Sequence, residues 1–286
     1  MPLLIFVTLV WAFSFSLIGE FLAAQVDAYI AVFIRMLLAF AALAPFLRIR
    51  HTSPRLRFYM MAIGGVQIGL MYILLYHAFL YLSVAELLLF TIFTPLYIAL
   101  IDERLLNKKQ LPSRWWLAAA LSVLGAGIIR YQGVDSQFLT GFLLIQGANL
   151  CFAAGQVAYK RLQLHTAKTQ VEHYALFFLG AVLVSGLGML FFADFSRLPT
   201  TTIHWAILLW LGLGASGGGY LLWSIASKKV NIGQLATMNN ALIPAGLLVN
   251  FLIWGKDVSW GQLWLGGLII LFAVWLCRPH ANNAKD

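Results

Sequence analysis

The residues best suited to bind a small molecule are two adjacent amides, Asn239 and Asn240, in the otherwise apolar stretch QLATMNNALIPAGLLVN. Amides donate and accept hydrogen bonds, and burying them without partners is costly. Pro244 has no N–H, so it leaves the Asn240 carbonyl without its helical partner. The pattern indicates either a ligand-binding turn at a kink or amides that bond a neighbouring helix. Because adjacent helical residues point about 100° apart, we expect only one amide to face a cavity.

A second stretch, AELLLFTIFTPLYI, repeats this combination of polar side chains and proline with Thr91, Thr94 and Pro95. Threonine hydroxyls often bond back to their own helix, so a structural role is as well supported as a binding role. If the two proline-containing breaks face each other, they line one central cavity.

Aromatic side chains and one internal arginine complete the predicted substrate contacts. Tyr72, Tyr220, Trp223 and Trp11 could form rigid apolar walls. Arg35 lies within an apolar stretch, where an ionisable residue is a functional candidate by default. It could hold a carboxylate, its side chain could extend to the membrane surface, or it could bond backbone carbonyls. Further polar options from two other apolar stretches are Ser14, Asn149 and Gln156.

These residues must be positioned by helices that cross a membrane. Of the 286 residues, 62% are hydrophobic and 10% are charged, with a mean hydropathy of +0.86, whereas soluble domains carry about 25% charged residues. Continuous apolar runs, long enough to span a bilayer and not alternating as in a barrel, predict an all-α polytopic membrane protein with ten transmembrane helices. The predicted spans are roughly 3–22, 30–47, 58–79, 84–101, 115–131, 139–158, 173–193, 205–225, 233–254 and 260–277.

The distribution of positive charge predicts the orientation. Most of the 19 lysines and arginines fall in loops on one side, with Arg130, Arg197 and Lys256 on the other. The positive-inside rule then places both termini in the cytoplasm. The net charge of +9 is therefore a topology signal rather than a sign of nucleic-acid binding. Cys151 and Cys277 are interpreted as small apolar residues.

Three ionisable residues, Glu20, His77 and Glu86, fall near the outer ends of their predicted spans. They could gate the outer mouth of a cavity or carry a proton, or they could be solvated groups at the interface. The helix-breaking residues Pro95 and Pro244 belong to the same predicted gating or coupling set. Neither a P-loop nor the motifs H-E-x-x-H and G-x-S-x-G occur, so we expect no cofactor, no metal and no enzymatic activity.

The two halves of the chain resemble each other. The segment YHAFLYLSVAELLLFTIFTPLYIAL (76–100) aligns with SIASKKVNIGQLATMNNALIPAGLLVN (224–250), which brings Pro95 opposite Pro244. Each half has five predicted spans, so a direct repeat must insert its second half upside down. We predict an inverted repeat of residues 3–131 and 139–277, followed by a short cytoplasmic tail, 278–286. Such repeats commonly hold a site near the membrane midplane, at their interface.

Ten spans, two five-helix repeats and these proline motifs resemble the EamA type of the drug/metabolite transporter superfamily over residues 3–277. The stretches VWAFSFSLIGEFLA (10–23), AELLLFTIFTPLYI (85–98), GAGIIRY (125–131) and MNNALIPAGLLVN (238–250) are similar to the biotin transporters of its carboxylate/amino acid/amine branch. The chain departs from the general superfamily pattern at Gly19 and Glu20, where a lysine is frequent.

The resemblance implies a secondary transporter that moves biotin into the cell across the bacterial inner membrane by alternating access. The alternative is an exporter of amino acids or other small metabolites. The expected partners are the substrate and the lipid bilayer. The sequence leaves undecided whether the protein forms a homo-oligomer. Biotin's carboxylate would suit Arg35, its ureido group the asparagine amides, and its apolar part the aromatic walls. Amino acids and other amphipathic carboxylates suit the same side chains.

Overall fold

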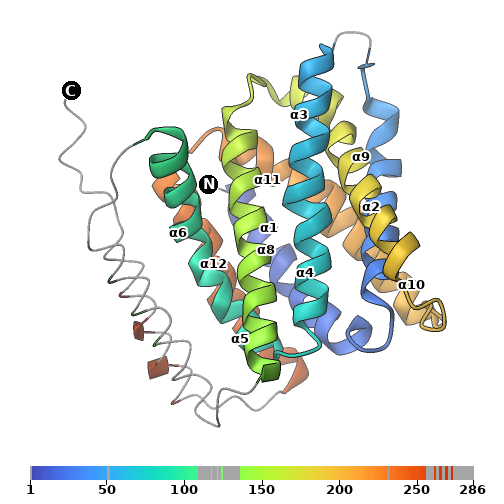
Figure 1. Cartoon of the computed structure of the whole chain (residues 1–286), viewed down its shortest axis with the longest axis vertical. Helices are drawn as coiled ribbons and strands as arrows, with labels where there is room; N and C mark the ends of the chain where they lie inside the picture. The colour runs from blue at the N-terminus through green and yellow to red at the C-terminus, as the bar shows by residue number, and fades with distance from the viewer. Residues whose placement is uncertain are drawn as a thin grey trace.

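The computed structural model describes residues 2–49, 52–108, 136–230 and 232–255, together with residues 117, 121, 124, 261, 264, 265, 268, 269 and 272. Within these ranges every regular element is helical, and the helices run side by side as a bundle (Figure 1). The α-helices are α1 (Pro2–Leu17), α2 (Ala28–Leu43), α3 (Pro54–Gly64), α4 (Met71–Ala78), α5 (Val84–Phe90), α6 (Thr94–Ala99), α8 (Ser136–Arg161), α9 (Ala167–Phe192), α10 (Thr202–Leu209), α11 (Gly219–Ser227) and α12 (Ile232–Trp254).

Shorter helical segments of different pitch continue several of these helices. Wide π-type turns form η1 (Ile18–Leu22), η4 (Gly65–Leu70), η6 (Leu100–Leu106) and η7 (Trp210–Gly218), and tight 3-10 turns form η2 (Ala44–Phe46) and η5 (Thr91–Phe93). Such turns shift the backbone hydrogen bonds away from the regular i to i−4 pattern. They can therefore release carbonyl groups that side chains bind.

Joined end to end, these elements form helices that can cross a membrane. Among the described residues, seven are long and apolar enough by length and composition: Pro2–Leu22, Ala28–Phe46, Pro54–Ala78, Val84–Leu106, Ser136–Arg161, Ala167–Phe192 and Thr202–Ser227. Helix α12 contributes a shorter apolar helix, Met238–Trp254. The predicted spans 115–131 and 260–277 lie outside the described residues except at isolated positions. The prediction of an all-helical multi-pass membrane protein is confirmed, and the number ten is not.

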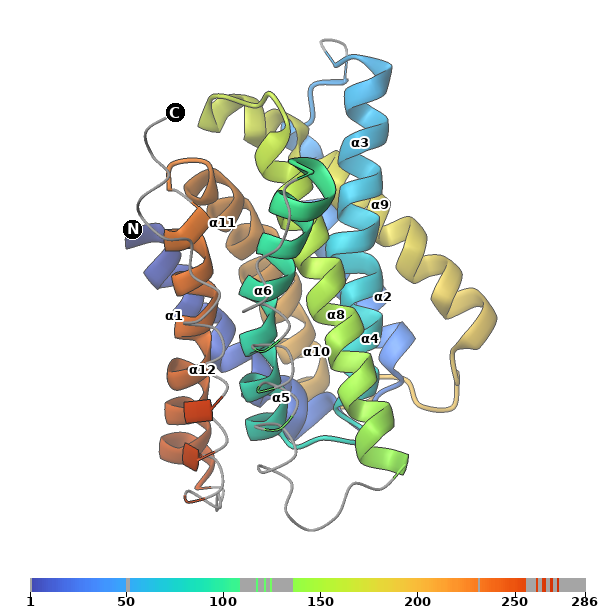
Figure 2. The same ribbon diagram turned by 60° about the vertical axis from the view of Figure 1, so that its left-hand side comes forward.

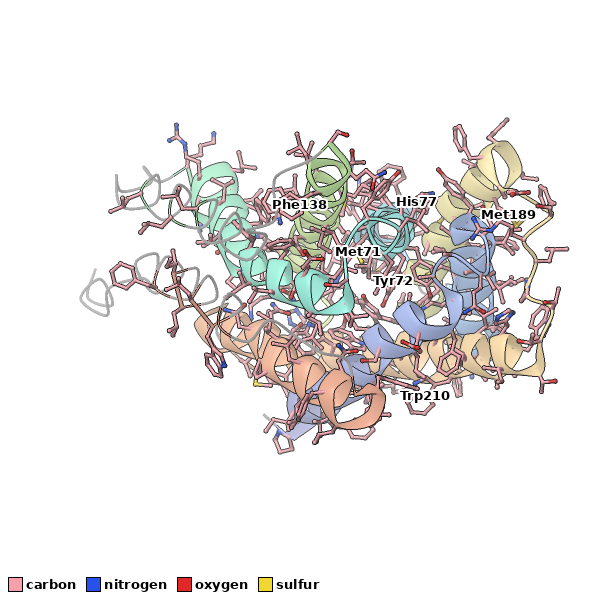
Figure 3. All side chains as sticks on the ribbon, turned by 90° about the horizontal axis from the view of Figure 1, so that it is seen from below. Met71, Tyr72, His77, Phe138, Met189 and Trp210 are labelled. Carbon is pink, nitrogen blue, oxygen red and sulfur yellow. The ribbon has the colours of Figure 1, made fainter. Side chains whose placement is uncertain are left out.

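The side-chain distribution suits a lipid environment. Large apolar side chains are exposed along the outer face of α9, as at Leu183, Leu187 and Phe191. Polar side chains such as Gln67 and Gln156 are buried between helices instead. Figure 3 shows Tyr72 inside the bundle and Trp210 at its outer edge. Polar groups inside a membrane bundle are expected to face its interior, where other protein groups can bond them.

Glycines bring α3 and α9 into backbone contact. A Cβ atom on Gly64 would lie 1.8 Å from the Phe177 carbonyl oxygen, and one on Gly180 would lie 1.8 Å from the Met61 carbonyl oxygen. Gly69 of the neighbouring η4 also faces α9. These glycines are required for close helix packing. One face of the third span therefore packs against α9.

Candidate functional site

A central cavity lies between α1, α2, α4, α6, α8, α11 and α12, with η1 and η5 also contributing. The empty space in and around it, open solvent at its mouth included, amounts to about 710 Å³. Most of its wall is apolar or aromatic. The helices around it are seen from two directions in Figures 1 and 2. The residues that line it are Thr8, Trp11, Ser14, Phe15, Ile18, Arg35, Met71, Tyr72, Leu75, Thr91, Thr94, Ile145, Ala148, Asn149, Phe152, Tyr220, Trp223, Met238, Asn239 and Leu242.

The structure brings most of the predicted substrate contacts together on this wall. The predicted contacts that line it are Arg35, Tyr72, Thr91, Thr94, Trp11, Tyr220, Trp223 and Asn239. Asn240 is not among the lining residues, and neither are Glu20, His77, Glu86, Pro95 and Pro244. Sequence reasoning missed Phe15, Met71, Phe152 and Met238, because an apolar residue that lines a cavity looks the same in a sequence as one that packs in the core.

Arg35 is fully buried in the wall of the cavity. Its Nη2 donates to the Tyr72 hydroxyl at 2.7 Å, its Nε to the Ser216 hydroxyl at 2.6 Å, and its Nη1 to the Tyr76 hydroxyl at 3.5 Å. The guanidinium also lies 3.9 Å from the centre of the Tyr72 ring. All the partners shown for Arg35 in the described part of the chain are neutral. An anion that leaves water to enter this cavity loses several kcal/mol of hydration. Arg35 offers it a counter-charge that is already in place, which offsets that loss.

The hydroxyl of Tyr72 is oriented by two incoming hydrogen bonds. It accepts one from Arg35 Nη2 and a second, at 3.1 Å, from the Tyr220 hydroxyl. A phenol oxygen has two acceptor positions and one hydrogen. With both acceptor positions occupied, the Tyr72 hydrogen is available to donate to a further group beside Arg35.

Trp11 bonds a backbone carbonyl that the wide turn η7 leaves without a helical partner. The Gly219 N–H bonds the carbonyls of Gly214 and Ser216 and passes over the carbonyl of Ala215. The indole Nε1 of Trp11 donates to this released Ala215 carbonyl at 2.9 Å. Trp11 therefore presents its ring to the cavity while its N–H is used within the protein.

Asn149 likewise bonds a backbone carbonyl that is left free, here at the tight turn η5. Pro95 has no N–H to offer the Thr91 carbonyl, and the Thr94 N–H bonds that carbonyl instead of the Phe90 carbonyl. Asn149 Nδ2 then donates to the Phe90 carbonyl at 2.8 Å. The proline predicted to open the helix does so, and the side chain that fills the gap comes from α8.

Thr91 shows the structural alternative for a membrane threonine. Its hydroxyl donates to the Leu88 carbonyl of its own helix at 2.6 Å. Thr94 instead reaches across to Asn149 Oδ1 at 3.4 Å. Both line the cavity, but Thr91 uses its hydrogen within α5.

The two predicted breaks do not match in the structure. Helix α12 runs without interruption from Ile232 to Trp254, and Pro244 lies on its exposed face. The expectation of a broken helix facing a broken helix is therefore wrong for the second half. Asn239 lines the cavity and donates through Nδ2 to Gln156 Oε1 of α8 at 3.0 Å. Its neighbour Asn240 points elsewhere, as the angle between adjacent helical residues requires.

Trp223 differs from Trp11 in its hydrogen bonding. The two rings pack with centroids 4.8 Å apart, and both line the cavity. Only 1% of Trp223 is exposed, and its indole Nε1 has no hydrogen-bond partner in the described part of the protein. A buried N–H without an acceptor is costly, which makes this indole a candidate donor to a ligand in the cavity.

The predicted gating residues have local structural partners. Glu86 forms a reciprocal cap with Ser83, whose N–H and hydroxyl donate to Glu86 Oε2 at 2.8 and 2.9 Å. His77 Nδ1 lies 2.7 Å from the Ile73 carbonyl oxygen. Glu20 is half-buried in η1. None of the three reaches the cavity wall.

A comparison with solved structures defines the fold. A protein of known crystal structure superposes on 96% of this chain, and over 96% of its own chain, with a TM-score of 0.66 and 18% sequence identity. At that identity the similarity concerns the fold alone. Together with the apolar spans, it places the chain among polytopic α-helical membrane proteins.

The comparison of sequences identifies the family. The model of the EamA-like transporter family matches residues 1–131. The biotin transporters of Escherichia coli K12 and Salmonella typhimurium are 45% and 46% identical to the chain, covering all of it and 97% of their own lengths. A probable biotin transporter of Pseudomonas aeruginosa is 47% identical over the whole of both proteins. The chain belongs to the EamA-like transporter family, and it is a transporter rather than an enzyme.

Proposed function

We propose that this protein imports biotin across the bacterial inner membrane and that the central cavity is its substrate site. Full-length relatives of 45–47% identity are named biotin transporters or, in one case, a probable one. The observation that carries the proposal is the fully buried Arg35, held by neutral hydroxyls beside aromatic walls. Biotin combines one carboxylate with a compact apolar body. Arg35 then bonds the carboxylate, and the aromatic rings contact the rest.

Transport is proposed to occur by rocking of two inverted five-helix repeats, 3–131 and 139–277, with residues 278–286 as the tail and both termini in the cytoplasm. Cross-contacts support this division, because Trp11 of α1 bonds η7 and Asn149 of α8 bonds the carbonyl of Phe90 in α5. In the proposed repeat, α1 and α8 are each the first helix of their half. Each first helix thus completes an irregular helix of the opposite half, at the cavity between them.

Uptake of labelled biotin tests the substrate and the direction. Biotin-starved cells that lack other uptake routes are compared with and without this protein, and with and without a proton uncoupler. We expect accumulation that depends on the protein and is competed by unlabelled biotin. Equal accumulation in both strains would overturn the proposal, and loss of preloaded label only in cells with the protein would indicate export.

A topology test is independent of the substrate. Reporter domains that are active only on one side of the membrane are fused after residue 286 and in the loop between α9 and α10. The proposed orientation requires a cytoplasmic signal at the first position and a periplasmic signal at the second. The reverse pair of signals contradicts the orientation, and two signals from the same side contradict the span count between them.

A further inference from the structure

Most polar donors on the cavity wall are already used within the protein. Trp11 Nε1 bonds the Ala215 carbonyl, Asn149 Nδ2 bonds the Phe90 carbonyl, the Thr91 hydroxyl bonds Leu88, and Asn239 Nδ2 bonds Gln156. Each of these donors would have to give up a protein acceptor to bind a ligand. The Asn239 amide, which the sequence suggests for a ureido group, thus already donates to a neighbouring helix.

Two donors at the cavity are in a different situation. The Trp223 N–H is buried without an acceptor in the described part of the chain. The Tyr72 hydroxyl receives two hydrogen bonds and keeps its own hydrogen. The first donor stands alone among aromatic rings, and the second stands beside the guanidinium of Arg35. The cavity therefore offers one neutral donor and one cationic group with an adjacent donor.

Arg35 of α2 and Trp223 are separated along the helix that η7 and α11 form together. Arg35 bonds Ser216 in η7, and Trp223 follows seven residues later in α11, which corresponds to about 10 Å along the helix at 1.5 Å per residue. A row of rings connects them, since Tyr72 and Tyr220 are 6.1 Å apart, and Trp11 is 4.8 Å from both Tyr220 and Trp223. The wall thus has a cationic end, an aromatic middle and a neutral donor end.

We infer that the substrate binds in one orientation, with its carboxylate at Arg35 and Tyr72 and its ureido carbonyl accepting a hydrogen bond from the indole N–H of Trp223. This inference rests on the proposed function and assigns Trp223 as a specificity-determining residue. Biotin carries these two groups at opposite ends. Its carbonyl satisfies the donor that the protein leaves unpaired, and its hydrocarbon chain lies along the rings.

Competition with analogues altered at one end tests the orientation. Labelled biotin uptake is inhibited by biotin, by a thio-analogue in which sulfur replaces the ureido oxygen, and by biotin amide, in which the carboxylate is neutral. Sulfur is a weak acceptor, so we expect the thio-analogue to inhibit the wild type about tenfold less well than biotin. Trp223→Phe removes the N–H and keeps a ring. In this variant inhibition by biotin should weaken about tenfold. The thio-analogue and biotin should then inhibit almost equally, so that the ratio of their inhibitory concentrations falls to near one.

The carboxylate end provides the internal comparison. The ratio between biotin and biotin amide should be unchanged by Trp223→Phe, because that end is held by Arg35. Trp254→Phe is the matched control, since the Trp254 indole also has no acceptor among the described residues but packs on Phe21 outside the cavity. It should leave both ratios at their wild-type values. Ratios are measured within each variant, so they do not depend on the amount of protein in the membrane.

The outcomes separate the two proposals. If the wild type takes up no biotin, the proposed function fails. If it takes up biotin but does not discriminate against the thio-analogue, or if Trp223→Phe keeps that discrimination, the contact with Trp223 is overturned. If Trp223→Phe removes discrimination against the amide instead, the orientation is reversed. Should Trp223→Phe fail to accumulate, benzothienylalanine at position 223, which keeps the two-ring shape and replaces N–H by sulfur, permits the same measurement.

Discussion

Replacing Arg35 by glutamine separates a substrate-binding arginine from a structural one. Three hydrogen bonds to neutral hydroxyls would be lost or weakened, at about 1 kcal/mol each. The change also removes a fully buried charge, whose desolvation costs several kcal/mol. The two contributions oppose each other. We therefore expect the stability of Arg35→Gln without ligand to lie close to that of the wild type.

Binding of biotin should change far more than stability. Removing one partner of a buried ion pair leaves the other charge uncompensated and costs about 3–5 kcal/mol. The dissociation constant should rise at least about 100-fold. At a biotin concentration of 100 times the wild-type dissociation constant, the ligand stabilises the wild type by about 2.7 kcal/mol, whereas a 100-fold weaker variant gains only about 0.4 kcal/mol.

Thermal unfolding of purified protein in detergent, with and without biotin, measures both quantities. Arg57→Gln is the matched control, because Arg57 also donates to neutral oxygens, those of Thr52 and Ile49, but lies outside the cavity. It should keep the full ligand-induced shift. The reasoning is refuted if biotin stabilises Arg35→Gln as strongly as the wild type, or if Arg35→Gln unfolds at much lower temperature while uptake is retained.

Three further predictions follow from individual contacts. Asn239→Ala should reduce uptake about tenfold, and Asn240→Ala should leave it near the wild-type rate, because only Asn239 lines the cavity; equal effects on labelled uptake would contradict this. Gly64→Ala should lower the yield of folded protein, since its Cβ would lie 1.8 Å from a carbonyl oxygen, whereas Gly218→Ala, with its nearest atom at 3.6 Å, should fold normally in size-exclusion profiles. Burial and the nearby Lys160 lower the pKa of Lys228 to about 8. The unfolded chain then binds more protons between about pH 8 and pH 10.4, so stability should rise with pH across this window. Lys228→Met should show a smaller rise in melting temperature between pH 7.5 and 9.5, and an unchanged slope would count against the assignment.

The membrane class and most of the spans could be predicted because they depend on local properties. A run of about 20 apolar residues is long enough to cross the hydrocarbon layer whatever the rest of the chain does. Polar residues within such runs are expected to face the interior, and Arg35 and Asn239 do line the cavity, as do Tyr72 and Trp223.

The sequence could not show which polar side chains are still available to a ligand. Trp11 and Trp223 look equivalent as residues of apolar spans, yet the N–H of Trp11 bonds a carbonyl 204 positions away and that of Trp223 has no acceptor within the described residues. Asn149 is likewise occupied by the Phe90 carbonyl, 59 positions away. The same limit explains Pro244, which the repeat pairs with Pro95 although the structure breaks only the helix at Pro95.

The sequence by itself determined that the chain is a multi-pass helical membrane protein, and which few polar residues must be kept from lipid, because hydropathy and helix periodicity act over one or two turns. The tertiary structure alone decided that Arg35 meets Tyr72 and Ser216, that Asn239 rather than Asn240 reaches the cavity, and that the Trp223 N–H has no acceptor among the described residues. The physical reason is that a hydrogen bond requires two atoms within about 3 Å. Helices distant in sequence meet that condition only once they are packed together.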